Sequence, residues 1–276
     1  MSIKLIGLDI DGTLLTRGKR LTPRTCGAIE AAAYAGIRVA YLTGRPLSGI
    51  TEDIRLDSVG YIVSSNGAVT HDAQTGAPLR GRFIPKDAAR GVAVAARQSG
   101  LNATVFTGGL GYCESAFYAA LMAEYEERGN LAYGQASRRP TDDLLALIDR
   151  DQNGIENICV DTNDEEAHRA MLRVIANWPE LRLVTTRGNR GLNLEIGHPE
   201  ADKGLAFLHL AGLLGIDRAD TLAIGDDGND LGLLRAAGTA VAMGNATDEV
   251  KRACAWVTED NEHDGAAKAI ERIIGN

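Results

Sequence analysis

The stretch Gly7–Leu14, "GLDIDGTL", places two carboxylates at the end of an apolar run. Residues 3–9, "IKLIGLD", are almost continuously apolar, which is typical of a strand covered on both faces in a parallel sheet. Burying an ionised carboxylate is costly unless a cation or dense hydrogen bonding compensates for it. Asp9 and Asp11 therefore indicate a binding or catalytic role at the end of this strand.

The sequence around this stretch alternates strands with helices. We predict strands at 37–42 and 61–65, a helix over about 23–35 that begins after Thr22-Pro23, another helix that opens at Pro46, and a hairpin with its turn near 74–76. The pattern resumes with a strand at 192–196, a helix over about 203–214 and a strand at 221–226. Together these elements predict an α/β fold with a Rossmann-like, doubly wound parallel sheet.

The middle of the chain has a different pattern. Helical periodicities at 86–98, 116–128 and 164–176 alternate with short β-rich segments. This indicates a separate α+β domain inserted into the first. The predicted boundaries are 1–82 and 191–276 for the core domain and 83–190 for the inserted cap domain.

Composition restricts the environment and the partners. The 276 residues are 45% hydrophobic and 24% charged, with a formal net charge of −8 and no basic run, so we do not expect a nucleic-acid partner. No segment is apolar over the roughly 18 residues that a membrane span requires, and the first residues lack the features of a secretory signal. We expect a cytoplasmic protein with no membrane partner. The four cysteines lie far apart and form no metal or disulfide motif.

Polar side chains gather where the predicted core strands end. In open α/β sheets, ligands bind beyond the carboxyl ends of the strands. The candidates at that edge are Asp9, Asp11, Thr43, Asn66, Asp226 and Asp230. Carboxylates converging there would repel one another without a cation, and oxygen ligands without His or Cys suit Mg²⁺. Lys203, in the first turn of its predicted helix, opposes the helix dipole and is expected to hold an anion or these carboxylates.

Six segments together resemble the haloacid dehalogenase superfamily of phosphohydrolases, and within it the Cof-type branch. They are "DIDGTL" at 9–14, "LTGR" at 42–45, "SSNGA" at 64–68, "ADKG" at 201–204, "IGDDGND" at 224–230 and the tail "VAMGNATDEVKRACAWVTEDNEHDG" at 241–265. Their order and spacing match over the whole predicted core. The inserted domain resembles the cap of that branch only in its position and in its alternation of helical and β-rich segments.

The resemblance implies a Mg²⁺-dependent phosphomonoester hydrolase that acts through an aspartyl-phosphate on small phosphorylated metabolites, with sugar phosphates favoured. It implies that Asp9 is the nucleophile and Asp11 the general acid and base. Thr43 and Lys203 would bind phosphoryl oxygens. The implied metal ligands are Asp9, the Asp11 carbonyl and Asp226, with Asp230 and Asn229 completing the metal loop.

Further positions are assigned to the substrate. By the same resemblance these are Gly44, Arg45, Asn66, Gly67 and Asn245. Arg187, with Asn189, Arg190 and Asn193, lies near the point where the chain returns to the core, where a closing cap could direct it at the distal groups of a substrate.

Three other functions stay open at this point. A phosphotransferase or mutase would pass the aspartyl-phosphate to a second substrate instead of water. A receiver-like signalling domain also combines an Asp cluster with Thr and Lys, but lacks a counterpart of Asp11. A non-catalytic phosphosugar-binding protein is the third. The sequence is compatible with a monomer or a homodimer.

Overall fold

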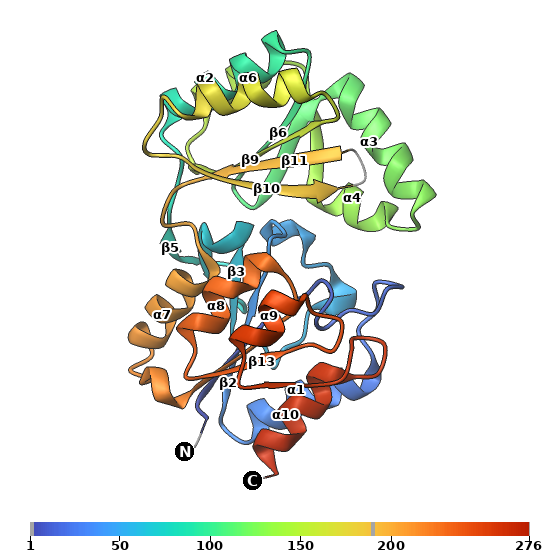
Figure 1. The fold of residues 1–276 in the computed structure, drawn as a ribbon, viewed down its shortest axis with the longest axis vertical. Coiled ribbons are helices and arrows are strands. Elements are labelled where there is room, and N and C mark those ends of the chain that lie inside the picture. Colours follow the sequence, from blue (N-terminus) through green and yellow to red (C-terminus); the bar gives the residue numbers. More distant parts are fainter. Residues whose placement is uncertain (1–2, 189–190, 276) are drawn as a thin grey trace. The chain divides into compact units, whose positions relative to one another are not determined.

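A computed structural model of the chain describes residues 3–188 and 191–275, with the backbone alone for residues 186–188. The chain divides into two compact units (Figure 1). The first contains Met1–Gly44, Ile50–Arg80 and Asp202–Asn276, and the second contains Arg45–Gly49 and Gly81–Ala201. Each unit has its own sheet and its own buried core.

The first unit is built on a mainly parallel sheet. Within the described residues its strand order is β14-β13-β12-β1-β2-β3-β4-β5. The strands are β1 (Leu5–Leu8), β2 (Arg38–Leu42), β3 (Tyr61–Ser64), β4 (Val69–Asp72), β5 (Pro78–Gly81), β12 (Thr221–Gly225), β13 (Thr239–Ala242) and β14 (Trp256–Val257). Pairing is parallel from β14 to β3, whereas β4 runs antiparallel to β3. The predicted α/β, Rossmann-like core is confirmed.

Helices cover both faces of this sheet. They are α1 (Pro23–Tyr34), α7 (Lys203–Leu213), α8 (Leu231–Ala236), α9 (Asp248–Ala253) and α10 (Gly265–Ile274). The connections β1–α1–β2 and β12–α8–β13 step in opposite directions across the sheet, so right-handed crossovers put α1 and α8 on opposite faces. Helix α10 packs on α1, and α7 packs on α8. No helix in the described part of the chain combines the length and apolar character that a bilayer crossing needs.

Local signals in the sequence explain where α1 begins and ends. The Thr22 hydroxyl accepts a hydrogen bond from the Thr25 N–H as the N-cap, and Pro23 occupies the first turn. Gly36 follows the helix with φ +84°, a left-handed conformation that favours glycine. The predicted helix after Pro46 is wrong: the segment forms two 3₁₀ turns, Leu47–Gly49 and Glu52–Ile54. Ser48 and Gly49 are poor helix formers, and they interrupt the helix after one turn.

The second unit contains a mixed sheet. Its order in the described residues is β10-β11-β9-β6-β7-β8, with β7 and β8 parallel and the other recorded pairs antiparallel. The strands are β6 (Asn102–Thr107), β7 (Leu110–Glu114), β8 (Arg138–Thr141), β9 (Ile155–Thr162), β10 (Arg182–Gly188) and β11 (Gly191–Gly197). This unit is a separate mixed-sheet cap domain.

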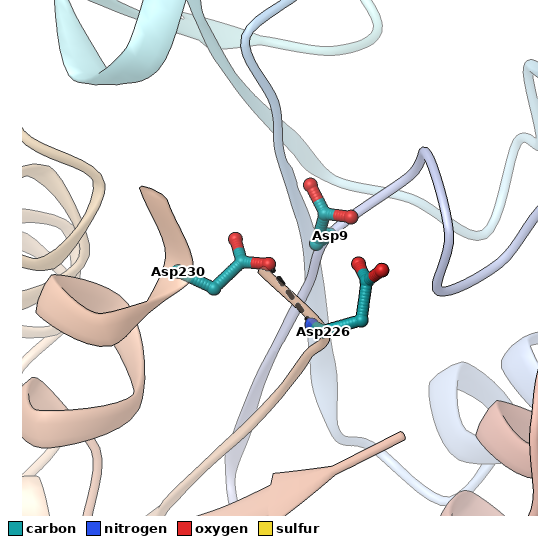
Figure 2. Close-up of side chains that lie close together, drawn as sticks. All are labelled: Asp9, Asp226 and Asp230. Atoms are coloured by element: carbon teal, nitrogen blue, oxygen red, sulfur yellow. Dashed lines mark hydrogen bonds between the residues drawn. The ribbon is translucent and has the colours of Figure 1, made fainter. Parts of the chain in front are cut away.

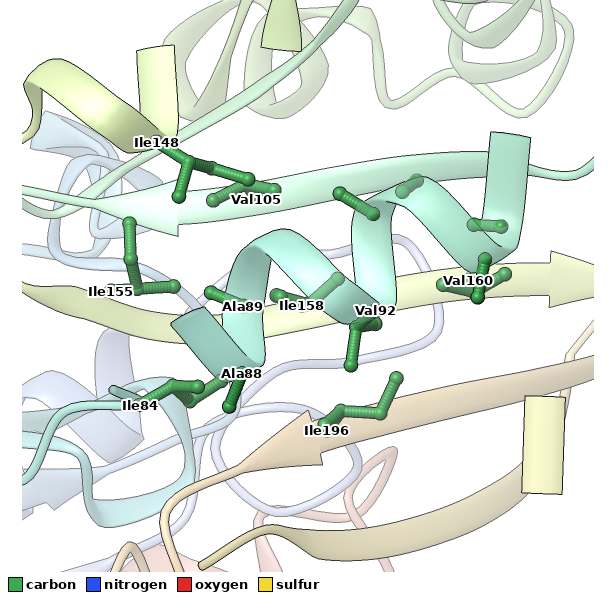
Figure 3. Close-up of a cluster of buried hydrophobic side chains, with 14 of the residues drawn as sticks. Ile84, Ala88, Ala89, Val92, Val105, Ile148, Ile155, Ile158, Val160 and Ile196 are labelled. Atoms are coloured by element: carbon green, nitrogen blue, oxygen red, sulfur yellow. The ribbon is translucent and has the colours of Figure 1, made fainter. Parts of the chain in front are cut away.

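The predicted helices of the second unit are confirmed as α2 (Lys86–Gln98), α3 (Ser115–Glu127) and α6 (Glu165–Ile175). Figure 3 shows α2 lying over the strands with its apolar side chains directed at them. Val92 of α2, Ile148 of α5 (Leu144–Arg150) and Ile158 of β9 are fully buried in this cluster. Helices α5 and α4 (Leu131–Ser137) were not predicted, because each spans only two turns.

The predicted core strand at 192–196 is instead part of β11. It lies between β9 and β10 in the cap sheet and is antiparallel to both. The physical reason is visible in "LNLEI": apolar Leu192, Leu194 and Ile196 alternate with polar residues. Such alternation is typical of a strand with one covered face, whereas a strand inside a doubly wound sheet is covered on both faces.

A matched pair of glycine substitutions tests the contact that places Lys203. Gly204, the next residue of α7, has room for no side chain, because a Cβ there would lie 2.2 Å from the Gly232 carbonyl oxygen. Gly212, in the same helix, has nothing within 4 Å of such an atom. We predict that Gly204→Ala destabilises the protein by about 1–3 kcal/mol and that Gly212→Ala stabilises it by up to about 1 kcal/mol. Urea unfolding of both variants measures this, and equal effects would contradict the packing described.

Candidate active site

Three carboxylates of the first unit converge where neighbouring strands end. Asp9 follows β1, Asp226 follows β12, and Asp230 closes the 3₁₀ turn Gly228–Asp230. Because β1 and β12 are adjacent and parallel, their carboxyl ends meet at one edge of the sheet. One carboxylate oxygen of each residue lies within 4.8 Å of the other two, and Figure 2 shows the three groups turned toward one another.

The Lys203 ammonium joins two of these carboxylates. Its Nζ lies 2.7 Å from Asp9 Oδ1 and 2.7 Å from Asp230 Oδ1. The side chains are 1%, 6% and 1% exposed in the order Lys203, Asp9 and Asp230, so water screens these ion pairs very little. Asp202 is the N-cap of α7, accepts from the Gly204 and Leu205 N–H groups, and fixes the start of the helix that carries Lys203.

Burial and mutual repulsion perturb the titration of the cluster. Burial, reinforced by the Asp230 charge, raises the pKa of Asp9 well above its usual value, while Lys203 opposes the shift. Burial also raises the pKa of Asp226 to about 7, again reinforced by Asp230. Burial alone would lower the pKa of Lys203, but its two carboxylate partners outweigh that effect and raise it. The site thus carries more negative charge than one lysine can balance.

Hydrogen bonds orient the carboxylates from outside the cluster. Asp230 Oδ2 accepts from the backbone N–H groups of Asp226 at 3.0 Å and Asp227 at 3.2 Å. Asp226 Oδ1 accepts from the Thr13 hydroxyl at 3.2 Å, and its Oδ2 accepts from the Asn245 amide at 3.2 Å. Each oxygen of Asp226 therefore has one donor, which fixes the plane of its carboxylate.

The donor set fits a hard divalent cation. With all three carboxylates ionised, the cluster and its one ammonium carry a net charge of −2. Asp9 Oδ2 is buried, and no hydrogen-bond donor of the described residues reaches it. A buried, unpartnered carboxylate oxygen is costly unless a cation or a ligand takes it up. The cluster offers only oxygen ligands, and these are the ligands that Mg²⁺ prefers over softer metals.

The Asp11 carboxylate lies apart from this cluster. Its Oδ1 forms an ion pair with Lys19 Nζ at 2.8 Å, and both side chains are partly exposed. Lys19 sits in the turn after β1 with φ +56°, an uncommon backbone conformation for a residue with a side chain. Asp11 is thus the one carboxylate of the "DIDGT" segment that solvent and a partner on the surface can reach.

Four of the predicted phosphate and substrate residues of the first unit, Thr43, Gly44, Asn66 and Gly67, follow the carboxyl ends of β2 and β3. Thr43 is buried, and its carbonyl accepts from the Asn66 N–H at 3.0 Å. Asn66 Oδ1 accepts from the Asn229 amide at 3.2 Å, which links β3 to the metal loop. A Cβ on Gly44 would contact the Asn66 side chain, and one on Gly67 would collide with the Asp202 backbone.

Two predicted substrate residues belong to the second unit. Arg45 is buried there, with its guanidinium 4.7 Å from the centre of the Tyr133 ring and its Nη1 donating to the Gly49 carbonyl. The backbone of Arg187 pairs with Leu192 in the β10–β11 hairpin, not at the return to the core, and its side chain is not among those described. Asn189 and Arg190 lie outside the described residues. Asn193 lies in β11, with a buried amide oxygen.

Sequence reasoning assigned no role to three residues that contact the site or its supporting residues: Thr13 bonds Asp226, Lys19 pairs with Asp11, and Asn261 bonds Asn245 and Leu15. Thr13 belongs to "DIDGTL", and its place beside the two acids of that motif was a signal that its hydroxyl could bond a carboxylate of the site. Lys19 lies in a turn with no distinguishing pattern. Asn261 is buried within the acidic tail segment "TEDNEHDG", and its amide donates to the Leu15 carbonyl at 2.7 Å. The one signal in the sequence was an uncharged Asn within this acidic segment.

Comparison with known proteins agrees with this geometry. A family profile of haloacid dehalogenase-like hydrolases matches residues 6–270, nearly the whole chain. The chain belongs to this family. Within it, the core with its inserted mixed-sheet cap places the chain in the Cof-type branch.

Relatives of similar length support the assignment. The chain is 28% identical to the putative phosphatase YxeH of Bacillus subtilis, with 98% of each chain covered. It is 27% identical to the 5-amino-6-(5-phospho-D-ribitylamino)uracil phosphatase YwtE of the same organism, covering 99% of this chain and 98% of the relative. A solved haloacid dehalogenase-like hydrolase from Bacteroides thetaiotaomicron superposes with a TM-score of 0.83 at 26% identity, covering 99% and 100%. This haloacid dehalogenase-like chain is a phosphatase.

The raised pKa of Asp226 predicts how pH affects the metal-free protein. In the unfolded chain this carboxyl titrates near 4, whereas in the folded chain it titrates at about 7. Between these values the folded state holds a proton that the unfolded state has released, so stability falls as pH rises from about 4 to about 7. Asp226→Asn removes this dependence. We predict that in EDTA the variant gains in melting temperature over the wild type on going from pH 5 to pH 8. If the difference in melting temperature between Asp226→Asn and the wild type is the same at both pH values, the raised pKa of Asp226 is contradicted.

Proposed function

We propose that this phosphatase is a Mg²⁺-dependent phosphomonoester hydrolase that acts on small phosphorylated metabolites through an aspartyl-phosphate on Asp9. The single observation that carries the proposal is the state of Asp9. One of its oxygens is fixed by Lys203 at 2.7 Å, and the other is buried without a donor among the described residues. A carboxylate held rigidly with one oxygen open is arranged to bind a cation or to attack an electrophile.

In the proposed first step, an Asp9 carboxylate oxygen attacks phosphorus and the bond from phosphorus to the leaving oxygen breaks. Asp11 donates a proton to that leaving oxygen. The transferred group spreads negative charge over three oxygens, which fixed donors can stabilise. The Thr43 hydroxyl and the Lys203 ammonium are proposed as those donors. The partial exposure of Asp11, in contrast to buried Asp9, supports a role in proton exchange with the leaving group.

In the proposed second step, a water molecule attacks phosphorus and Asp11 takes its proton. The bond from phosphorus to the Asp9 oxygen breaks, and the products are inorganic phosphate and the free carboxylate. The same residue serves as acid and then as base, so no other proton carrier is required. Lys203 keeps its pair with Asp230 throughout, which holds the ammonium in place when Asp9 is esterified.

We propose Asp9, the Asp11 carbonyl and Asp226 as the residues that hold Mg²⁺, with Asp230 and Asn229 ordering the loop around them. The net charge of −2 and the all-oxygen donor set support this assignment. When bound, the cation would neutralise part of the negative charge of the carboxylates and of the substrate phosphate.

The substrate class is proposed from the relatives. The relative YwtE is named for a uracil that carries a phosphorylated ribityl chain, and the ribityl chain is a polyol. Sugar phosphates and polyol phosphates are therefore the first compounds to screen. The residues proposed to contact the substrate are Gly44, Arg45, Asn66, Gly67, Arg187 and Asn245.

Replacing the proposed nucleophile tests the mechanism. We predict that Asp9→Asn lowers kcat for p-nitrophenyl phosphate with Mg²⁺ present by on the order of 10⁴-fold or more, because the covalent step is lost. Asp227→Asn is the matched control: Asp227 lies in the same loop, but its Oδ1 caps the turn by accepting from the Gly228 N–H. Steady-state kinetics of both variants decide the matter. Retention of near-normal turnover by Asp9→Asn would refute the mechanism.

The role of Asp11 predicts a dependence on the leaving group. An alkoxide leaving group needs a proton, whereas p-nitrophenolate leaves readily without one. We therefore expect Asp11→Asn to reduce kcat/KM for an alkyl phosphate by about 10²–10⁴-fold and to reduce that for p-nitrophenyl phosphate much less. The measurement is kcat/KM of both proteins for a series of phosphate esters, plotted on a logarithmic scale against the pKa of the leaving group. The slope should be steeper for Asp11→Asn than for the wild type. An equal loss for all substrates would show that Asp11 is not the general acid.

A further inference from the structure

Two asparagine side chains connect the C-terminal segment to the loop that follows β1. We call Asn245 and Asn261 the asparagine clasp. The Asn245 amide donates to the Gly12 carbonyl at 2.9 Å and to Asp226 Oδ2 at 3.2 Å. Its own carbonyl oxygen accepts from the Asn261 N–H at 3.0 Å. The two bonds donated at one end of the amide and the bond accepted at the other fix its orientation.

Asn261 extends this chain of hydrogen bonds into the interior. The residue is 9% exposed, and its side-chain amide donates to the Leu15 carbonyl at 2.7 Å. Leu15 is itself buried, so its carbonyl has little access to water. Losing a donor to a buried carbonyl costs more than losing one at the surface. The Asn261 amide therefore holds Leu15, while its backbone N–H holds Asn245.

The loop that Asn261 and Asn245 hold contacts the carboxylate cluster directly through Gly12 and Thr13. Gly12 has φ +88°, and a Cβ there would lie 2.2 Å from Asp226 Oδ2. The next residue, Thr13, donates its hydroxyl to Asp226 Oδ1. Both oxygens of Asp226 are thus contacted by the 12–13 loop or by Asn245, so a shift of the loop away from Asn261 would move the donors that orient Asp226.

We propose that Asn261 is a positioning residue for the Asp226 carboxylate: it acts through Leu15 and Asn245 to keep that carboxylate in the geometry that binds a divalent cation. The proposal rests on the proposed function only in taking the carboxylate cluster as a cation site. Residues that orient metal ligands without touching the metal commonly change affinity by 10–100-fold when they are replaced.

Other bonds between the same two segments provide a matched control. Glu262 Oε1 accepts from the Arg17 N–H at 2.5 Å, and Asp264 Oδ1 accepts from the Thr22 hydroxyl at 2.6 Å. Neither bond involves Asn245 or Asp226. These tethers keep the two segments together when Asn261 is replaced, so Asn261→Ala is expected to fold. Glu262→Ala removes a tether next to Asn261 without touching the clasp.

The experiment measures Mg²⁺ binding to EDTA-stripped protein by titration calorimetry, with the Mg²⁺-induced rise in melting temperature as a second readout. We expect Asn261→Ala to bind Mg²⁺ about 10-fold more weakly than the wild type, and Glu262→Ala to bind it with unchanged affinity. If Asn261→Ala does not fold, Asn245→Ala tests the same chain of bonds from its exposed end and is expected to lose affinity similarly.

Two results would overturn the proposal. The first is wild-type Mg²⁺ affinity in Asn261→Ala, or in Asn245→Ala if Asn261→Ala does not fold. The second is a loss of affinity in Glu262→Ala equal to that in Asn261→Ala. The latter would mean that any tether between the segments has the same effect. Turnover by the wild type separates this proposal from the proposed function. If the wild type binds Mg²⁺ but hydrolyses no phosphomonoester, while Asn261→Ala binds more weakly, the clasp is supported and the proposed reaction fails.

Discussion

The buried ion triad of Asp9, Lys203 and Asp230 is the constraint around which the first unit is arranged. Each carboxylate lies 2.7 Å from the one ammonium, and all three side chains are shielded from water. Removing one partner of such a group leaves an uncompensated buried charge, which costs about 3–5 kcal/mol. The triad ties together the end of β1, the first turn of α7 and the turn after β12. In this group Lys203 fixes one carboxylate oxygen of Asp9, and no donor among the described residues reaches the other.

The second unit carries none of these carboxylates within its described residues. It has its own sheet and its own cluster of buried apolar side chains, so insertion of residues 81–201 does not interrupt the core of the first unit. This separation explains why the six sequence motifs lie almost wholly in the first unit. Arg45 of "LTGR" and Ala201 of "ADKG" are the exceptions, since Arg45–Gly49 and Gly81–Ala201 belong to the second unit.

Local chemistry explains which features could be predicted from the sequence. Thr22, Pro23 and Gly36 mark the ends of α1 because capping depends on a few adjacent residues. The apolar runs that end in Asp9 and Asp226 predict parallel strands, and parallel strands bring their carboxyl ends together. Features that depend on tertiary context were missed. Whether "LNLEI" joins the core or the cap sheet depends on its partners β9 and β10, and the pairing of Lys19 with Asp11 depends on a turn with no sequence signal.

Chemical trapping of the intermediate tests the central claim most directly, namely that Asp9 is the group that carries phosphate. Borohydride reduces an aspartyl-phosphate to homoserine, so protein quenched during turnover of a phosphomonoester with Mg²⁺ can be digested and sequenced by mass spectrometry. Homoserine is predicted at position 9, and only when substrate is present. Unmodified Asp9 in protein that is turning over substrate, or homoserine at position 11 instead, would contradict it.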